Sequence, residues 1–281
     1  MTMMIRSALR CACLLILASP VLSQSPGDVR EDEAVGNSVN YVFATDLGSG
    51  VYDLDGRTLQ IYRYTYRRAL RETREDQMGV RFTLPLTAGF FDFNPFDVIA
   101  SGPPRRVDSL SVVPGLELDY LLENGWHLVP YARAGFSLAS SSVDGWLYGA
   151  GLRVERRRDY GEWSGLLRSE LAFAAVNYRD DQPADQFVRL RQGFDFTRAF
   201  GPEYRKRRLD IGLYGIFDYV ADPPTAPVAN GRQVPAQAEF GFTFATAPRF
   251  KIWRFDAPRL GFGYRIAGQL SAWRFVIGEP F

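Results

Sequence analysis

Apolar and polar residues alternate along most of the chain from about residue 39 onward. In residues 148–155, YGAGLRVE, the even positions are apolar or aromatic and the odd positions are glycine or charged. Residues 239–244, EFGFTF, place phenylalanine at every even position. A period of two residues is typical of a β-strand with one apolar face. No helical period of useful length occurs, so the sequence predicts an all-β fold.

The alternation recurs in segments that are separated by turn residues, as expected for successive antiparallel strands. Most segments exceed the five or six residues of an average soluble strand and reach the length of about nine to eleven that a tilted transmembrane strand needs. Twelve strands are expected, at residues 39–53, 57–69, 78–92, 108–121, 126–138, 144–157, 163–178, 186–197, 207–220, 236–246, 257–267 and 270–281.

Two architectures share this pattern: a soluble β-sandwich and a closed transmembrane β-barrel. The polar face is rich in glycine and arginine, which suits a crowded, narrow lumen better than open solvent. Tryptophan and tyrosine near the strand ends fit interfacial girdles. Because every backbone group must be paired in a bilayer, such a sheet has to close. The sequence therefore predicts a closed antiparallel transmembrane β-barrel of twelve strands. A count of ten stays open, because the connection 247–256 is long for a periplasmic turn.

The first residues have the three parts of a secretory signal peptide. Arg6 and Arg10 form a basic region, residues 11–18 form a short apolar core, and Val21 and Ser23 are the small residues of a cleavage site. Export of the barrel then leads to the bacterial outer membrane. The expected organisation is a signal peptide at 1–23, a short periplasmic segment at 24–38 and the barrel at 39–281.

Cysteine content and charge exclude several classes of function. Both cysteines, Cys11 and Cys13, lie in the signal peptide, so the mature chain offers no thiolate for zinc. Without the two signal arginines the chain carries 31 basic and 32 acidic residues. This balance gives no indication of a nucleic-acid partner. No cofactor motif is present, and no cofactor or metal is expected.

Three stretches resemble the solitary autotransporter-like family of outer-membrane barrels. They are residues 258–281 (PRLGFGYRIAGQLSAWRFVIGEPF), 112–120 (VVPGLELDY) and 83–93 (TLPLTAGFFDF). The resemblance implies a twelve-stranded barrel like an autotransporter translocator. The segment 24–38 is too short for a passenger domain, so autotransport itself is not implied. The resemblance also implies that Phe281 ends the last strand and is an assembly signal for the barrel-assembly machinery.

The polar face of the expected strands would line the lumen. Opposite charges on neighbouring strands could form a structural network that fills a narrow barrel, or a charged lining that selects ions. The structural network is favoured, because twelve strands leave only modest room and large arginines narrow it further. The lumen is expected to carry Arg81, Glu117, Asp119, Arg133, Arg153, Glu155, Arg168, Glu170, Arg189, Arg191, Asp195, Asp210, Asp218, Glu239, Arg265 and Arg274.

The only histidine, His127, raises the alternative of a lipid-modifying barrel enzyme. A nucleophile needs its base within hydrogen-bond reach. His127 follows the tight turn at Asn124-Gly125, on the expected periplasmic side, whereas Ser140, Ser141 and Ser142 lie at the far end of the same strand, roughly 40 Å away. The sequence therefore favours a rim residue and a non-enzymatic barrel.

The remaining alternative is a surface adhesin or receptor that works through the long outer loops, 93–107 and 221–235. The expected partners are outer-membrane lipid and lipopolysaccharide, with the barrel-assembly machinery during biogenesis. The sequence does not define the oligomeric state. The leading hypothesis is an integral outer-membrane barrel that acts as a structural barrel or as a narrow ion or small-solute pore.

Overall fold

The computed structural model describes the barrel domain in segments. They are residues 48–54, 57–91, 109–139, 145–179, 184–204, 206–221, 235–249, 251–252, 255–267 and 270–281. The expected signal peptide (1–23), the periplasmic segment (24–38) and the beginning of the first expected strand lie outside the described residues. So do most of the long outer loops and the three serines considered with His127.

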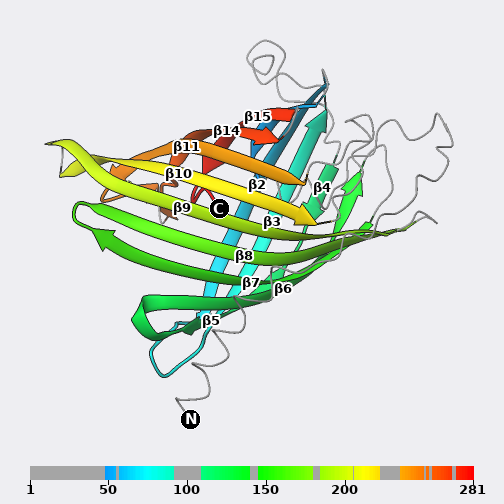
Figure 1. Ribbon diagram of the computed structural model, residues 1–281, viewed down its shortest axis with the longest axis horizontal. Helices are drawn as coiled ribbons and strands as arrows, with labels where there is room; N and C mark the ends of the chain where they lie inside the picture. Colours follow the sequence, from blue (N-terminus) through cyan, green and yellow to red (C-terminus); the bar gives the residue numbers. More distant parts are fainter. Residues whose placement is uncertain are drawn as a thin grey trace. The chain divides into compact units, whose positions relative to one another are not determined.

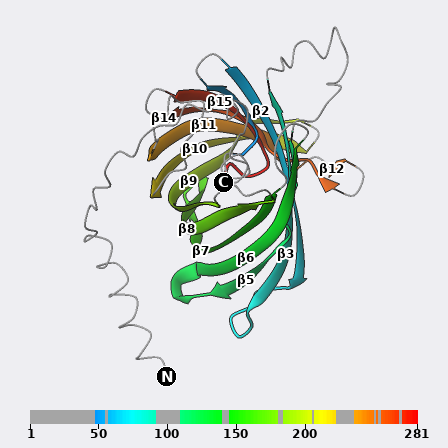
Figure 2. The same cartoon turned by 90° about the vertical axis from the view of Figure 1, so that its right-hand side faces the viewer.

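The described strands form one large antiparallel sheet that curves around a central lumen (Figures 1 and 2). Its thirteen strand segments are joined in a ring by hydrogen bonds. The strands are β1 (Gly50–Leu54), β2 (Arg57–Arg71), β3 (Gly79–Phe91), β4 (Ser109–Val112), β5 (Gly115–Leu121), β6 (Trp126–Ala139), β7 (Gly145–Tyr160), β8 (Trp163–Tyr178), β9 (Asp185–Tyr204), β10 (Arg207–Ala221), β11 (Ala236–Ala247), β14 (Leu260–Ala267) and β15 (Leu270–Ile277).

The strands β4 and β5 together occupy the place of one strand in the barrel. Both pair with β3 on one side and with β6 on the other, and the strand is interrupted between them at Val113 and Pro114. A proline has no N–H to donate to a sheet, which accounts for an interruption at this point. With these two segments counted as one, the barrel has twelve strands. The predicted count of twelve is confirmed, and the alternative of ten is wrong.

The ring closes where the first strand meets the last. Val51 on β1 lies opposite Trp273 on β15, and β1 also pairs with β2. No edge of the sheet remains open at this junction, as a bilayer requires.

The connection 247–256, whose length had left a count of ten strands possible, contains a small hairpin of its own. Its strands, β12 (Lys251–Ile252) and β13 (Phe255–Asp256), pair only with each other among the described strands.

Several strand boundaries differ from those expected. The strand expected at 186–197 extends to Tyr204 as β9, and the one expected at 257–267 begins at Leu260 as β14. The final strand ends at Ile277 rather than at Phe281. Gly278 has a φ of 98°, a conformation that a residue with a side chain rarely adopts, and there the backbone leaves the sheet. The last four residues turn into the lumen.

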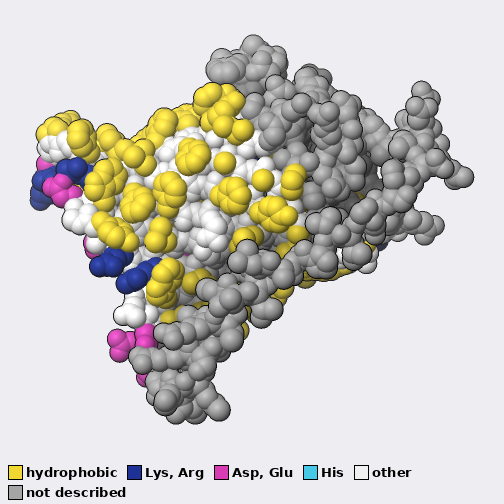
Figure 3. Space-filling model, viewed as in Figure 1, with side chains coloured by type: hydrophobic (Ala, Val, Ile, Leu, Met, Phe, Trp, Pro, Cys, Tyr) yellow, Lys and Arg dark blue, Asp and Glu magenta, His cyan; other side chains and the backbone are white. Residues whose placement is uncertain are grey.

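The two faces of the sheet have opposite chemistry. Large apolar side chains cover the outside: Trp146 and Phe240, for example, are 63% and 61% exposed (Figure 3). Charged side chains are enclosed inside: Arg153 is 8% and Glu239 is 1% exposed. A soluble sandwich would place these groups the other way round. The arrangement is that of a barrel with an apolar outer surface and a polar lumen.

The described residues contain no helix that is both long and apolar enough to cross a membrane.

Candidate functional site in the barrel lumen

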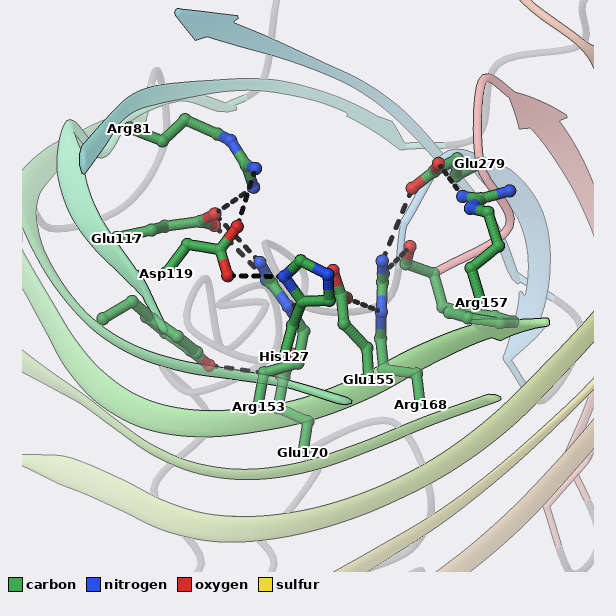
Figure 4. A network of polar contacts seen from close by, with 12 residues as sticks. Arg81, Glu117, Asp119, His127, Arg153, Glu155, Arg157, Arg168, Glu170 and Glu279 are labelled. Carbon is green, nitrogen blue, oxygen red and sulfur yellow. Dashed lines mark hydrogen bonds and ion pairs between the residues drawn. The ribbon is translucent and has the colours of Figure 1, made fainter. Parts of the chain in front are cut away.

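A chain of ion pairs runs along the inner surface of the barrel wall from β3 to β8 (Figure 4). Arg81 lies opposite Glu117 in the register and binds its carboxylate at 3.0 Å. Arg153 binds the same carboxylate at 2.9 Å and reaches Glu155 with its Nε at 3.1 Å. Arg168, which lies opposite Glu155, binds it at 2.9 Å. Alternation within each strand and antiparallel register between strands thus bring the five side chains together.

A second chain of ion pairs joins β9, β10, β11, β14 and β15. Arg191 lies opposite Asp218 and holds it through two hydrogen bonds of 2.6 and 2.8 Å. Arg265 lies opposite Glu239 and binds it at 2.8 Å. Arg274, two strands away from Glu239, binds its other oxygen at 3.0 Å. Glu239 therefore ties β11 to both strands that follow it.

Three further predicted lumen residues face the space between these chains. Arg189 binds Glu170 at 2.7 Å, and the hydroxyl of Tyr131 donates to the same carboxylate at 3.2 Å. Arg133 lies with its guanidinium carbon 6.0 Å from the centre of the Tyr131 ring and lines the central cavity. Besides Asp218 and Glu239, eleven of the sixteen residues expected in the lumen lie along the interior of the barrel. They are Arg81, Glu117, Arg133, Arg153, Glu155, Arg168, Glu170, Arg189, Arg191, Arg265 and Arg274.

Sequence reasoning missed Arg259, which precedes β14. Its guanidinium holds Asp195 of β9 through contacts of 2.5 and 3.0 Å and also contacts the Thr243 hydroxyl. Arg259 is only 4% exposed. It lies just before β14, but the strand expected at 257–267 includes it. Its odd position matches that of Gly261, Gly263 and Arg265 on the polar face, so the alternation did carry a signal for it.

Tyr214 on β10 is a second residue that was missed. Its ring lies over Gly241 of β11 and Gly263 of β14, which face each other in the register. A side-chain carbon built at Gly241 would lie 2.5 Å from the tyrosine hydroxyl. That hydroxyl donates to Glu239 at 2.8 Å. The sequence does carry a signal, because Tyr214 stands in the row of glycines and acids on the polar face of its strand.

An apolar cluster lies in the lumen at the end away from the β7–β8 turn. The alternating pattern places charged residues and glycines in the lumen and did not predict this apolar cluster. The apolar residues come from the start of β7, the end of β8, the start of β9, the end of β10 and the β4–β5 break. They are Val113, Leu147, Ala174, Val176, Phe187 and Val220, with Tyr178 packed against them. An apolar constriction opposes the passage of water and ions.

The last four residues, Gly278–Phe281, form a short tail that folds into the lumen at the other end. Arg168 contacts the backbone oxygen of Phe281, and its guanidinium carbon lies 4.9 Å from the centre of the Phe281 ring. Phe281 also packs against the buried cluster of Tyr214, Ile216 and Val276. Phe281 thus lies inside the barrel and not in the closing strand. Its role as an assembly signal stays a prediction.

Glu279 and Pro280 anchor the same tail. The Glu279 carboxylate lies 3.5 Å from Arg168 and 3.4 Å from Arg157, and Arg274 contacts the backbone oxygen of Pro280. Burial alone would raise the pKa of Glu279, but the positive charges of Arg168, Arg67 and Arg157 outweigh it and hold the pKa below its usual range. The tail is therefore held most firmly when this carboxyl is ionised.

His127 is the second residue of β6 and lies beside Asp119, in an arrangement of the described residues that differs from a hydrolytic triad. Its Nδ1 lies 2.8 Å from one oxygen of Asp119, and the Thr73 hydroxyl donates to the other oxygen at 2.8 Å. A hydrolytic triad would place the histidine between the acid and the nucleophile. Here the acid lies between the histidine and the hydroxyl. Among the described residues no group of histidine, cysteine or carboxylates could hold a metal ion.

The fold and the lumen together define the class of protein: a transmembrane β-barrel of the outer-membrane type. The β domain of the Bordetella autotransporter BrkA has a similar structure, with a TM-score of 0.50 and 11% identity, covering 81% of this chain and 93% of that one. For the translocator domain of the autotransporter NalP from Neisseria meningitidis, the TM-score is 0.46 and the identity 7%, covering 80% of this chain and 82% of that one.

At the level of the fold, the similarity to the BrkA domain confirms the resemblance seen in the sequence: the chain is an autotransporter-like barrel of twelve strands. No protein-family model matches the sequence, and no curated protein matches it.

Proposed function

We propose that this chain is an integral outer-membrane barrel and that its lumen is closed at rest. The observation that carries the proposal is the tail Gly278–Phe281, which lies inside the barrel and is held there by Arg168 and Arg274. The apolar outer face supports residence in a membrane, where outer-membrane lipid and lipopolysaccharide would be its surroundings. Assembly by the barrel machinery would follow from the same location.

Two fillings of the lumen support a closed barrel. The tail lies at the end where β15 finishes, and the apolar cluster around Val176 lies at the opposite end. Between them, the arginines of the wall ion pairs narrow the lumen. A twelve-stranded barrel leaves only modest room even without such fillings. We therefore favour a structural barrel over a permanently open channel.

A narrow pore remains the second candidate, and a specific observation favours it. A cavity of about 560 Å³ lies in the lumen beside the tail. If the tail left the lumen, this space would join the water at that end, and only the apolar cluster would still separate the two sides. The barrel would then be closed at rest. Displacement of the tail would leave the apolar cluster as the remaining barrier to conduction.

A non-enzymatic role is also part of the proposal. His127 is held by Asp119, and its neighbour Thr73 is bound to the same acid rather than to the histidine.

A surface adhesin would work through the loops 93–107 and 221–235, which lie almost entirely outside the described residues.

Single-channel recording tests the proposal. The chain without its predicted signal peptide is refolded and inserted into a planar bilayer in high salt, and folding is verified by heat-dependent migration on a gel. We expect no steady steps. Steady, ion-selective steps that change when Arg133 or Arg153 is replaced by glutamine would instead show that the barrel is an open pore.

A further inference from the structure

The cavity beside the tail has the dimensions of a ligand site. Its volume is about 560 Å³, within the range of roughly 300–1,000 Å³ that is usual for small-molecule pockets. Side chains from both chains of ion pairs line it, as do the residues of the tail. The barrel wall separates this space from the surroundings of the outer face, so a ligand would reach it through the lumen.

The described residues around the cavity carry an excess of positive charge. Nine arginines and three carboxylate residues line it. Three more carboxylates, Glu155, Asp218 and Glu239, pair with lining arginines from behind. Even with these included, nine positive charges face six negative ones. A cavity with a net positive charge raises the local concentration of anions.

The arginines come from several strands and point into one space. Arg67 on β2 is solvent-exposed although it faces the lumen, and Arg133 on β6 is half-buried. Both line the cavity. Arginine presents a rigid fork of donors that matches the oxygens of phosphate and carboxylate groups. The side chains are thus arranged to receive an oxyanion from several sides.

The protein's own tail already places an anion at the edge of this cavity. The Glu279 carboxylate lies 3.5 Å from Arg168 and 3.4 Å from Arg157, and it is further stabilised by the charge of Arg67. Arg168 and Arg67 also line the cavity. A soluble anion with more charge than a carboxylate would therefore compete with Glu279 for the same guanidinium groups.

We propose that the lumen cavity binds a soluble, phosphate-bearing anion and that this anion displaces Glu279 from Arg168. The ligand enters from the end where the tail lies, because the tail residues themselves line the cavity. Binding occurs without any conduction through the barrel. The inference therefore goes beyond the closed barrel proposed above and does not depend on it.

Isothermal titration calorimetry with pyrophosphate tests the proposal. The refolded barrel is held in non-ionic detergent at low ionic strength, where screening is weak. We expect saturable binding at one site, weakened at least tenfold by Arg67→Gln. The matched control is Arg158→Gln, which removes the same charge from a side chain that lies 5.6 Å from the Tyr160 ring and does not line the cavity. This control should change the affinity less than twofold.

A second variant separates competition by the tail from general charge attraction. Glu279→Gln removes the competing carboxylate, so pyrophosphate should bind several-fold more tightly. Arg133→Gln replaces Arg67→Gln if the latter does not fold, as judged by its migration on a gel. No saturable binding to the folded barrel, or equal losses in Arg67→Gln and Arg158→Gln, would overturn the proposal. Tighter binding of citrate than of pyrophosphate would overturn the assignment to phosphate.

Discussion

The guanidinium carbon of Arg168 lies 4.9 Å from the centre of the Phe281 ring, although 113 positions separate the two residues in the sequence. The same side chain binds Glu155 on the neighbouring strand and Glu279 in the tail. One buried arginine on β8 thus connects the ion pairs of the wall to the tail that fills the lumen. Its removal should affect both.

Arg168→Gln should destabilise the barrel, whereas Arg157→Gln should not. Arg168 is buried, and removal of one partner from a buried ion pair costs about 3–5 kcal/mol. The Arg157 side chain is 60% exposed, and an exposed pair contributes about 0–1 kcal/mol. The free energy of unfolding in urea, followed by gel migration or tryptophan fluorescence, gives the comparison. Equal losses in the two variants would contradict the central role of Arg168.

Acid should release the tail. A carboxyl whose pKa is lower in the docked tail than in the free tail stabilises docking above the free pKa, and this contribution is lost as the pH falls through the docked pKa. Because an ordinary glutamate has a pKa of about 4.3, the loss begins below about pH 4. We expect proton-dependent exposure of Phe281, measured by hydrogen exchange of the tail.

Glu279→Gln is the control for this pH dependence. The variant has no carboxyl to titrate at this position. Protection of its tail, expressed relative to the intrinsic exchange rate at each pH, should therefore be low at pH 6 and should change little down to pH 3. A wild-type tail that stays protected at pH 3, in a barrel that remains folded, would argue against docking by Glu279.

Alanine at Gly263 should weaken the barrel because it collides with the hydroxyl of Tyr214. That hydroxyl is the atom nearest to a side-chain carbon built at Gly263, so an added methyl group forces the tyrosine away from Glu239. Overpacking of this kind costs about 1–3 kcal/mol. In a double-mutant cycle with Tyr214→Ala, the cost of the alanine should largely disappear. Additive losses, measured as midpoints of heat-dependent gel migration, would show that Gly263 is needed for another reason.

Conduction should require changes at both ends of the lumen. Glu279→Gln loosens the tail, and Leu147→Ser makes the apolar cluster more polar. Since each obstruction is sufficient to interrupt a water path, either variant alone should stay silent in a planar bilayer. The double variant should show small, steady steps. Large steps from Leu147→Ser alone would show that the tail does not close the barrel.

The strand pattern could be predicted because successive side chains of a barrel strand point alternately to the outside and to the lumen. Each face of β7 or β11 meets either the outside or the lumen along its whole length, so alternation marks both the strands and the residues that line the lumen. The break between β4 and β5 also has a local cause in Pro114. These features depend on residues that are neighbours in the sequence or in the register.

Other features depend on partners that the pattern does not connect. Arg274 reaches Glu239 across an intervening strand, and Arg259 binds Asp195 on β9, which is not a neighbour of β14 in the sheet. The path of the tail is decided by Arg168, far away in the chain. Leu147 reads as a minor exception on the polar face of β7, and only the curvature of the sheet brings it against Val176 and Phe187. Such contacts follow from closure of the barrel and not from alternation.

The cationic groups in the wall ion pairs, Arg81, Arg153, Arg168, Arg191 and Arg274 among them, are guanidiniums. A guanidinium keeps its proton at every pH that a protein survives, whereas a carboxylate can accept one. The electrical balance of these pairs can therefore move in only one direction when the surroundings become acidic, towards a more positive interior. Acidification can therefore add to the attraction for the anion proposed to bind in the cavity and cannot reverse it.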